Sequence, residues 1–228
     1  VLGPIHSKEV ALLCSSFTLQ SLALGPFDFG SKTIPRMIQK IFEKKSTLKT
    51  LHLDLCGPMP DMSNAVALAY LLCYHPVLER FKLHIPTDLG KDDTFLMAIL
   101  ENGLIPSCHL SASKLKEFLA YGLSDTVSPR VEQTVAELLS SSPACVLETF
   151  ILSDYEGPWR DHIDFYLRMN KMGRKRLLQG LVTASLTDVV RELTNSSGDI
   201  DFLFYLLRRG PSLCSLLPIA PPRKQLPD

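Results

Sequence analysis

Two histidines and one pair of aspartates are the side chains whose types and spacing could support chemistry. His52 and His84 lie in short strand-like segments, where a histidine can act as a pH-sensitive contact or as a catalytic base. No nucleophile or paired carboxylate stands beside either residue, so we interpret both as surface histidines. Asp92 and Asp93 could hint at a metal, but an acidic pair before a helix is more typical of N-terminal capping. We therefore predict neither a catalytic nor a metal site.

Common catalytic and cofactor-binding motifs are missing from the chain. It contains no GxSxG, no GxGxxG after a strand, no phosphate-binding GxxxxGKS/T and no HExxH. Its six cysteines are widely spread without a CxxC pair, which argues against a zinc site and against a disulfide framework. We expect a protein that is not an enzyme, needs no cofactor and works in a reducing, intracellular compartment.

A run of basic residues is the strongest local charge feature: Lys171, Arg174, Lys175 and Arg176. From residue 160 onward, 11 Lys and Arg stand against 7 Asp and Glu, about +4, which leaves about −4 on the residues before. The run could bind phosphate, RNA or an acidic partner. The interpretation that we favour is the solvated end of a helix, where cations complement the dipole. The binding role stays open as the alternative.

The totals describe an ordinary folded chain. Its 228 residues are 46% hydrophobic and 21% charged, with 24 basic and 24 acidic side chains. A net charge of zero gives no whole-molecule attraction to nucleic acid or to an anionic membrane. No apolar run reaches the ~18 residues of a membrane span, and the first ten residues are not typical of a secretory signal. We expect a soluble protein, with its compartment not further defined.

A repeated pattern with apolar residues at its first, fourth and sixth positions supplies the elements that position these side chains. It begins at residues 19, 48, 78, 115 and 147, so the intervals are 29, 30, 37 and 32 residues. The copies read LQSLAL, LKTLHL, LERFKL, LKEFLA and LETFIL. Apolar residues of one unit cannot be buried by that unit alone, so the pattern predicts strands stacked side by side.

A helix is expected after each strand pattern. Apolar residues at helical spacing predict helices near residues 34–45, 62–74 and 93–102. Ser128 and Pro129 indicate the start of a further helix, with the serine as N-cap and the proline at the first helical position. The interval of 37 residues is expected to absorb an extra loop at residues 105–108.

This organisation resembles the ribonuclease-inhibitor-like class of leucine-rich repeat proteins over about residues 15–155. The resemblance implies an α/β leucine-rich repeat solenoid, with a curved parallel sheet and outer helices. One feature departs from that class. Its usual Asn or Cys after the strand is not a regular column here, and Cys56 is the one possible example. An ordinary α/β domain with a doubly wound parallel sheet is the alternative, although its strands would be apolar on both faces.

The third, fifth and seventh positions of the pattern define the expected inner, concave surface of that sheet. One end of this surface is cationic and the other is apolar, a combination that protein partners commonly contact. Leu119 and Ile151 could instead pack under the C-terminal part of the chain. The predicted partner-binding residues are Thr50, His52, Asp54, Arg80, Lys82, His84, Leu119, Tyr121 and Ile151.

The pattern changes after residue 155. A long helix is expected over residues 159–178, and further helices over 185–193 and 200–208. We predict three parts: a repeat array at 1–155, a helical C-terminal cap at 156–217 and an extended tail at 218–228. Residues 163–217 contain the strings IDFYLRMNKMGR and FYLLR. This segment is similar to leucine-rich-repeat-like proteins expanded in diatoms, a resemblance that implies little about function.

Two hypotheses about function follow. The first is a non-enzymatic interaction module, or a structural subunit of a larger assembly, that binds a protein through its concave strand face. The alternative is a protein that binds nucleic acid or phosphate through the basic C-terminal cap. Neither the identity of a partner nor the oligomeric state can be predicted from these patterns.

Overall fold

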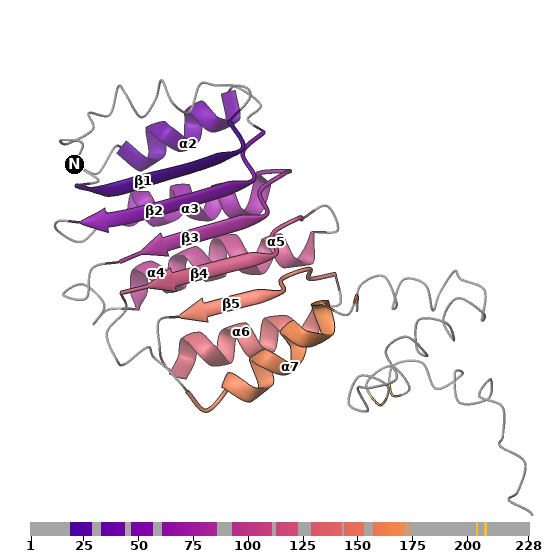
Figure 1. The fold of residues 1–228 in the computed structure, drawn as a ribbon. Coiled ribbons are helices and arrows are strands. Elements are labelled where there is room, and N and C mark those ends of the chain that lie inside the picture. The colour runs from indigo at the N-terminus through magenta and orange to yellow at the C-terminus, as the bar shows by residue number, and fades with distance from the viewer. Residues whose placement is uncertain are drawn as a thin grey trace, which may run out of the picture. The chain divides into compact units, whose positions relative to one another are not determined.

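The computed structural model describes residues 19–28, 33–43, 47–56, 61–85, 93–110, 113–122, 129–142, 144–152, 157–171, 173, 204 and 208. The chain divides into two units, residues 1–171 and 172–228. Strands and helices alternate along the first unit (Figure 1). In the second unit Phe204 and Arg208 are helical, as expected for residues 200–208.

The described part of the first unit contains five strands and the helices that connect them. The strands are β1 (Ser21–Asp28), β2 (Thr50–Cys56), β3 (Arg80–His84), β4 (Glu117–Tyr121) and β5 (Thr149–Leu152). The helical segments are α2 (Thr33–Glu43), α3 (Met62–Tyr74), α4 (Thr94–Ile99), the π-helical η2 (Leu100–Leu104), α5 (Ile105–His109), α6 (Pro129–Ser141) and α7 (Arg160–Lys171).

The strands form one parallel sheet in the order β1-β2-β3-β4-β5, so each strand pairs with the next one in the chain. In Figure 1, α3 and α4 lie behind the sheet, α2 is seen next to β1, and α7 lies beside α6 near β5. A doubly wound sheet reverses its strand order at a switch point. The sequential order therefore excludes that alternative for these five strands and is compatible with a solenoid-like arrangement.

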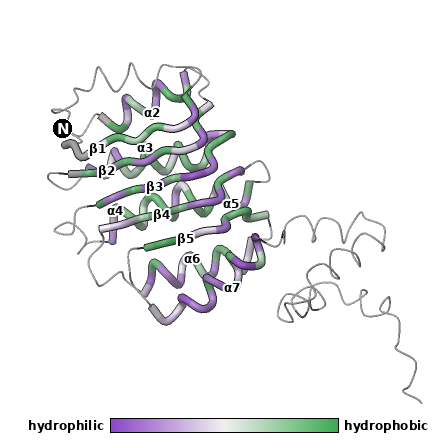
Figure 2. The backbone as a smooth tube through the Cα atoms, in the orientation of Figure 1, coloured by the Kyte–Doolittle hydropathy of each residue, from purple (hydrophilic) through white to green (hydrophobic). Residues whose placement is uncertain are grey.

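Alternation along the strands explains why helices cover this one face. Leu51, Leu53, Phe81 and Leu83 are fully buried, while the residues between them stay partly exposed. Figure 2 shows the same interruption of hydrophobic residues by hydrophilic ones along the strands. Side chains alternate between the two faces of a strand, so one face supplies the core and the other remains open.

A row of phenylalanines runs through the core from strand to strand. Phe81, Phe118 and Phe150 are register partners on β3, β4 and β5, and all three are at most 2% exposed. Neighbouring ring centroids are 5.6 Å apart in both pairs. This spacing lies within the range where aromatic rings attract each other beyond their burial alone. The fourth position of the repeated pattern therefore joins consecutive units through direct ring contact.

The backbone repeats as regularly as the side chains. The second-position carbonyls accept hydrogen bonds from two consecutive N–H groups of the next unit, at distances of 2.7–3.1 Å. The acceptors are Gln20, Lys49, Glu79 and Lys116. Each of the five units is thereby tied to its neighbour at the same point, in spite of unequal intervals along the chain.

The prediction of a loop at residues 105–108 is wrong, because these residues belong to helix α5. Residues 94–109 are instead helical throughout, as α4, η2 and α5 in succession, and this helical segment is longer than α3. In the π-helical turn η2, the Ile105 N–H donates to the Leu100 carbonyl, five residues back. Pro106 has no N–H, and its ring would crowd the carbonyl four residues earlier in a regular α-helix. A wider π turn just before it accommodates the proline.

The long helix expected to reach residue 178 ends earlier, at Lys171. Gly173 has φ +84°, a left-handed conformation that glycine adopts without cost and that commonly ends helices. Helix α3 has the predicted bounds, and Asp61 caps it by accepting a hydrogen bond from the Ser63 N–H at 3.3 Å. Asp93 precedes α4 but makes no side-chain capping bond.

Within the described residues, none of the helices combines the length and the apolar character needed to cross a bilayer.

Candidate functional site

The nine residues predicted to contact a partner all lie on the side of the sheet away from the helices, which we call the open face. Arg80 is exposed and the other eight are partly buried. The register aligns them in rows that cross the sheet. The rows are Thr50–Arg80–Glu117–Thr149, then His52–Lys82–Leu119–Ile151, then Asp54–His84–Tyr121. The expected juxtaposition of these side chains is thereby confirmed.

Asp54 and His84 form the tightest polar contact on the open face. The His84 Nδ1 lies 2.6 Å from the Asp54 Oδ1, between the ends of β2 and β3. Both side chains are partly exposed, at 44% for His84 and 32% for Asp54. The carboxylate accepts from Nδ1–H, which fixes the ring orientation and turns Nε2 away from the aspartate. A histidine held in this way presents Nε2 as a defined donor or acceptor.

Two glycines make room for this pair. Gly122 has φ +74°, and a Cβ there would lie 2.0 Å from the Ile85 carbonyl oxygen and 2.9 Å from His84 Nε2. Gly25 has φ +135°, and a Cβ there would lie 2.4 Å from Asp54 Cβ. Residues with side chains are strained at such angles and would collide here as well. Backbone without side chains therefore borders the pair on both sides.

The cationic side chains of the open face are matched by their neighbours. Arg80 Nε lies 3.2 Å from Glu117 Oε1 on β4. The Lys82 ammonium lies 4.9 Å from the ring centroid of Tyr121, which is a cation–π distance. These partly exposed contacts are individually weak, so they favour one arrangement of the side chains without fixing it. A binding partner can replace them at little cost.

The surroundings of His52 disfavour its charged form. Burial lowers the pKa of His52 below its ordinary value, and the positive charge of Lys82 lowers this pKa further. Asp54 opposes the shift, and His84 adds to it. His52 is therefore protonated to a smaller extent than a free histidine at the same pH.

A border of ion pairs runs along the start of the strands. Lys49 lies 3.6 Å from Glu79, and Lys116 lies 3.2 Å from Glu148. These are second positions of the repeated pattern, where basic and acidic residues alternate from unit to unit. The pairs are exposed and contribute about 0–1 kcal/mol each, so their value lies in favouring one register over another.

The Asp54–His84 pair has the kind of orienting contact that general bases also use. The described residues do not bring three His, Cys, Asp or Glu side chains together in a way that could hold a metal ion.

Lys171 is the one residue of the basic run that lies among the described residues. Lys171 is exposed and ends α7, where its charge complements the helix dipole. Arg174, Lys175 and Arg176 lie outside the described residues.

Leu119 and Ile151 are half-buried on neighbouring strands of the open face.

A second surface on the helical side was missed by the reasoning from sequence. Four exposed apolar residues follow one another every four positions along α3: Met62, Val66, Tyr70 and Tyr74. Two of them, Val66 and Tyr70, border a groove of about 630 Å³ between α2 and α3. Its apolar lining is Pro35, Ile38, Phe42, Val66, Ala67 and Tyr70, and its polar lining is Gln39, Ser63 and Glu43. The signal was present, because residues 62–74 contain no charged side chain at all. Surface helices usually have a polar face.

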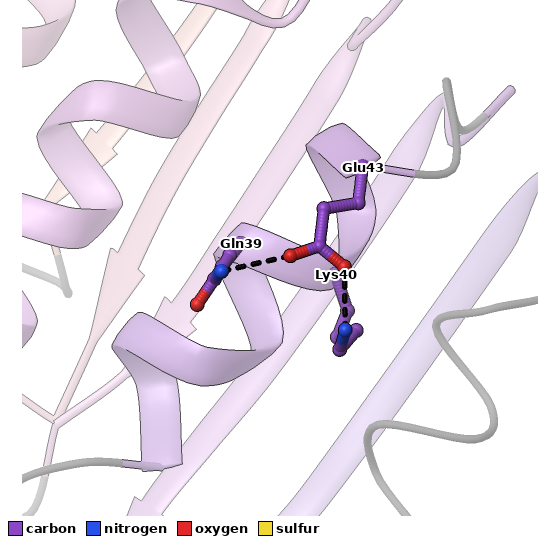
Figure 3. A network of polar contacts seen from close by, with 3 residues as sticks. All are labelled: Gln39, Lys40 and Glu43. Atoms are coloured by element: carbon purple, nitrogen blue, oxygen red, sulfur yellow. Dashed lines mark hydrogen bonds and ion pairs between the residues drawn. The ribbon is translucent and has the colours of Figure 1, made fainter.

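Polar side chains of α2 form the rim of this groove. Glu43 accepts a hydrogen bond from Gln39 at 2.7 Å and forms an ion pair with Lys40 one turn away (Figure 3). On the groove side, the Phe42 ring meets Tyr70 edge to face at a centroid distance of 5.1 Å. An apolar floor with a charged rim is the composition of many binding surfaces.

Comparison with known proteins found no family model that matches this chain and no curated protein sequence that is similar to it. The sheet, its open face and the groove are therefore interpreted on their own chemistry.

Proposed function

We propose that the protein is a non-enzymatic interaction module of the leucine-rich repeat type, which binds a protein partner through its open face. A structural subunit that contacts its neighbours through the same face is included in this proposal. The supporting observation is the open face itself. Five parallel strands present regularly spaced polar, aromatic and aliphatic side chains there, and none of the nine predicted contact residues is buried.

The repeated pattern supports the solenoid part of the proposal. The first, fourth and sixth positions are buried in nearly every unit, and the second-position carbonyl makes the same two hydrogen bonds from unit to unit. A solenoid grows by stacking such units, and its last unit needs a cover. We infer that α7 begins a C-terminal cap, since its buried Ile163 and Leu167 belong to the same core as β5.

The chemistry of the face indicates the kind of partner. Arg80, Lys82 and Glu117 place both signs of charge within one row or the next, and Tyr121 provides an aromatic anchor beside Leu119. Such a surface fits a mixed-charge protein surface with an apolar centre. It does not fit a polyanion, which requires uncompensated positive charge. Nucleic-acid or phosphate binding by the basic run has no supporting observation among the described residues.

The test is capture of partners from a lysate of the source organism, followed by identification of co-purifying chains. Arg80→Glu and Tyr121→Ala are the variants of the open face. Arg130→Glu and Tyr74→Ala are matched controls on helices, because Arg130 also pairs with a glutamate, at 3.5 Å, and Tyr74 is 58% exposed. The proposal predicts that a chain captured by the wild type is lost with the open-face variants and retained with the controls.

Two results would contradict the proposal. Capture that survives both open-face variants would remove this surface from the function. Capture that is lost only with Tyr74→Ala would assign the partner to the exposed apolar side of α3 instead.

A further inference from the structure

Two cysteines from consecutive units meet in the interior. Cys108 lies near the end of α5, and Cys145 lies in the segment that leads into β5. Their sulfur atoms are 3.1 Å apart, although the residues are separated by 37 positions in the chain. Cys108 is 3% exposed and Cys145 is 1% exposed. The spacing of the six cysteines along the sequence did not single out this pair.

The backbone around the two cysteines holds them in this position. The Ser142 hydroxyl donates to the Cys108 carbonyl at 2.8 Å, and the Cys145 N–H donates to the Ser142 carbonyl at 3.2 Å. Ser142 therefore ties together both segments that carry the sulfur atoms. A disulfide requires a sulfur–sulfur distance of about 2.05 Å. The two atoms need to approach by only about 1 Å, a movement within reach of small side-chain rotations.

We propose that Cys108 and Cys145 form an intrachain disulfide when the protein folds in the presence of a disulfide oxidant. In this reaction one cysteine thiolate attacks a small-molecule disulfide such as oxidised glutathione and releases one glutathione thiolate. The second cysteine then attacks the mixed disulfide and releases the other. The protein loses two protons and two electrons, and one glutathione disulfide gains them to become two glutathione thiols.

Burial decides when this reaction occurs. A thiol enclosed by apolar side chains ionises with difficulty, and the thiolate is the attacking species. The bond therefore forms during folding, before the core closes, and is afterwards shielded from reductants. It links α5 to the end of the next unit, just before β5, in addition to their non-covalent contacts. This inference is independent of what the open face binds.

The test uses the wild-type full-length chain, refolded from denaturant in a buffer of reduced and oxidised glutathione. Acid quenching, alkylation of free thiols and non-reducing proteolysis then precede mass spectrometry. We expect a linked peptide pair that contains Cys108 and Cys145, lighter by about 2 Da than the reduced pair. Its abundance is expected to exceed every other cysteine pairing by about tenfold, because these sulfur atoms are already within reach in the fold. Cys73, which is partly exposed on α3, is expected to be alkylated.

A second measurement, the melting temperature, tests whether the disulfide between Cys108 and Cys145 stabilises the protein. Refolding under oxidising conditions is expected to raise the melting temperature of the wild type and of a Cys73→Ala control relative to their reduced forms. The increase is expected to vanish in Cys145→Ala. Full alkylation of both Cys108 and Cys145 after oxidative refolding would overturn the proposal, as would their pairing mainly with other cysteines.

Discussion

The phenylalanine row allows a direct test of whether neighbouring units contact each other through their cores. Phe81, Phe118 and Phe150 have centroid separations of 5.6 Å within each neighbouring pair, and they are essentially inaccessible to solvent. Replacing any one of them by leucine removes part of a buried ring and leaves a small cavity. We expect each single substitution to lower the free energy of unfolding by about 1–2 kcal/mol.

The informative quantity is the coupling between two substitutions. For neighbours such as Phe81 and Phe118, the ring–ring interaction is lost once, so the double variant is less destabilised than the sum by about 0.5–1.5 kcal/mol. Phe81 and Phe150 are separated by β4, which places them about two strand spacings, or roughly 9.5 Å, apart. Their coupling is expected to fall within about 0.5 kcal/mol of zero.

Urea unfolding followed by far-ultraviolet circular dichroism provides these free energies. The three single variants and the two double variants complete both cycles, with the denaturant slope checked for constancy. Equal couplings in the two cycles would refute the nearest-neighbour arrangement of the core. Absence of coupling between Phe81 and Phe118 would refute the ring contact.

Three further predictions concern single sites. Burial lowers the pKa of His75, whose ring nitrogens lack partners among the described residues, so the unfolded chain binds a proton more readily than the native one. His75→Leu is therefore expected to stabilise the protein, and its gain in unfolding free energy over the wild type is expected to grow as pH falls through about 6.5. Urea unfolding at pH 8 and pH 5.5 measures this gain, and the same gain at both pH values would contradict the prediction. Gly122→Ala is expected to cost at least about 1–3 kcal/mol, because φ is +74° and the new Cβ would meet the Ile85 carbonyl; an unchanged urea midpoint would be inconsistent with that geometry. Tyr70→Ser, at a side chain that is 52% exposed, is expected to change stability by less than about 1 kcal/mol while reducing binding of a hydrophobic dye to the folded protein; undiminished dye binding would argue against an exposed apolar groove.

The sheet could be predicted from the sequence because its information is local and repeated. Strand side chains alternate with a period of two, so the apolar fourth and sixth positions fix which strand residues face the core. Stacking of equivalent positions then fixes the register, as in the row from His52 through Lys82 to Leu119. The bounds of helix α3 were equally clear, since uncharged and mostly apolar residues fill its full length.

Other features depend on contacts that no local pattern encodes. The Asp54–His84 pair needs the space left by Gly25 and Gly122, which lie in other units. The π turn before Pro106 allows the helix to continue through the proline. The proline considered alone suggested a loop. The end of α7 is determined by Gly173 in a left-handed conformation, whereas the apolar periodicity continues past it.

The sequence showed that α3 carries no charged residue, but it did not show that α3 borders a groove with α2. An uncharged helix can be buried on all sides or exposed as a binding surface, and only tertiary structure distinguishes the two. Val66, at 59% exposure, shows that part of α3 faces solvent in the described unit.

The central claim is that a protein partner binds the open face, and one affinity comparison tests it most directly. Once a partner has been purified, its dissociation constant is measured for wild type, Arg80→Glu and Arg130→Glu. Both substitutions reverse an exposed charge and break one arginine–glutamate pair, but on different surfaces. We expect Arg80→Glu to weaken binding by about tenfold or more and Arg130→Glu to leave it unchanged within about twofold. Equal affinities for all three proteins would contradict the claim.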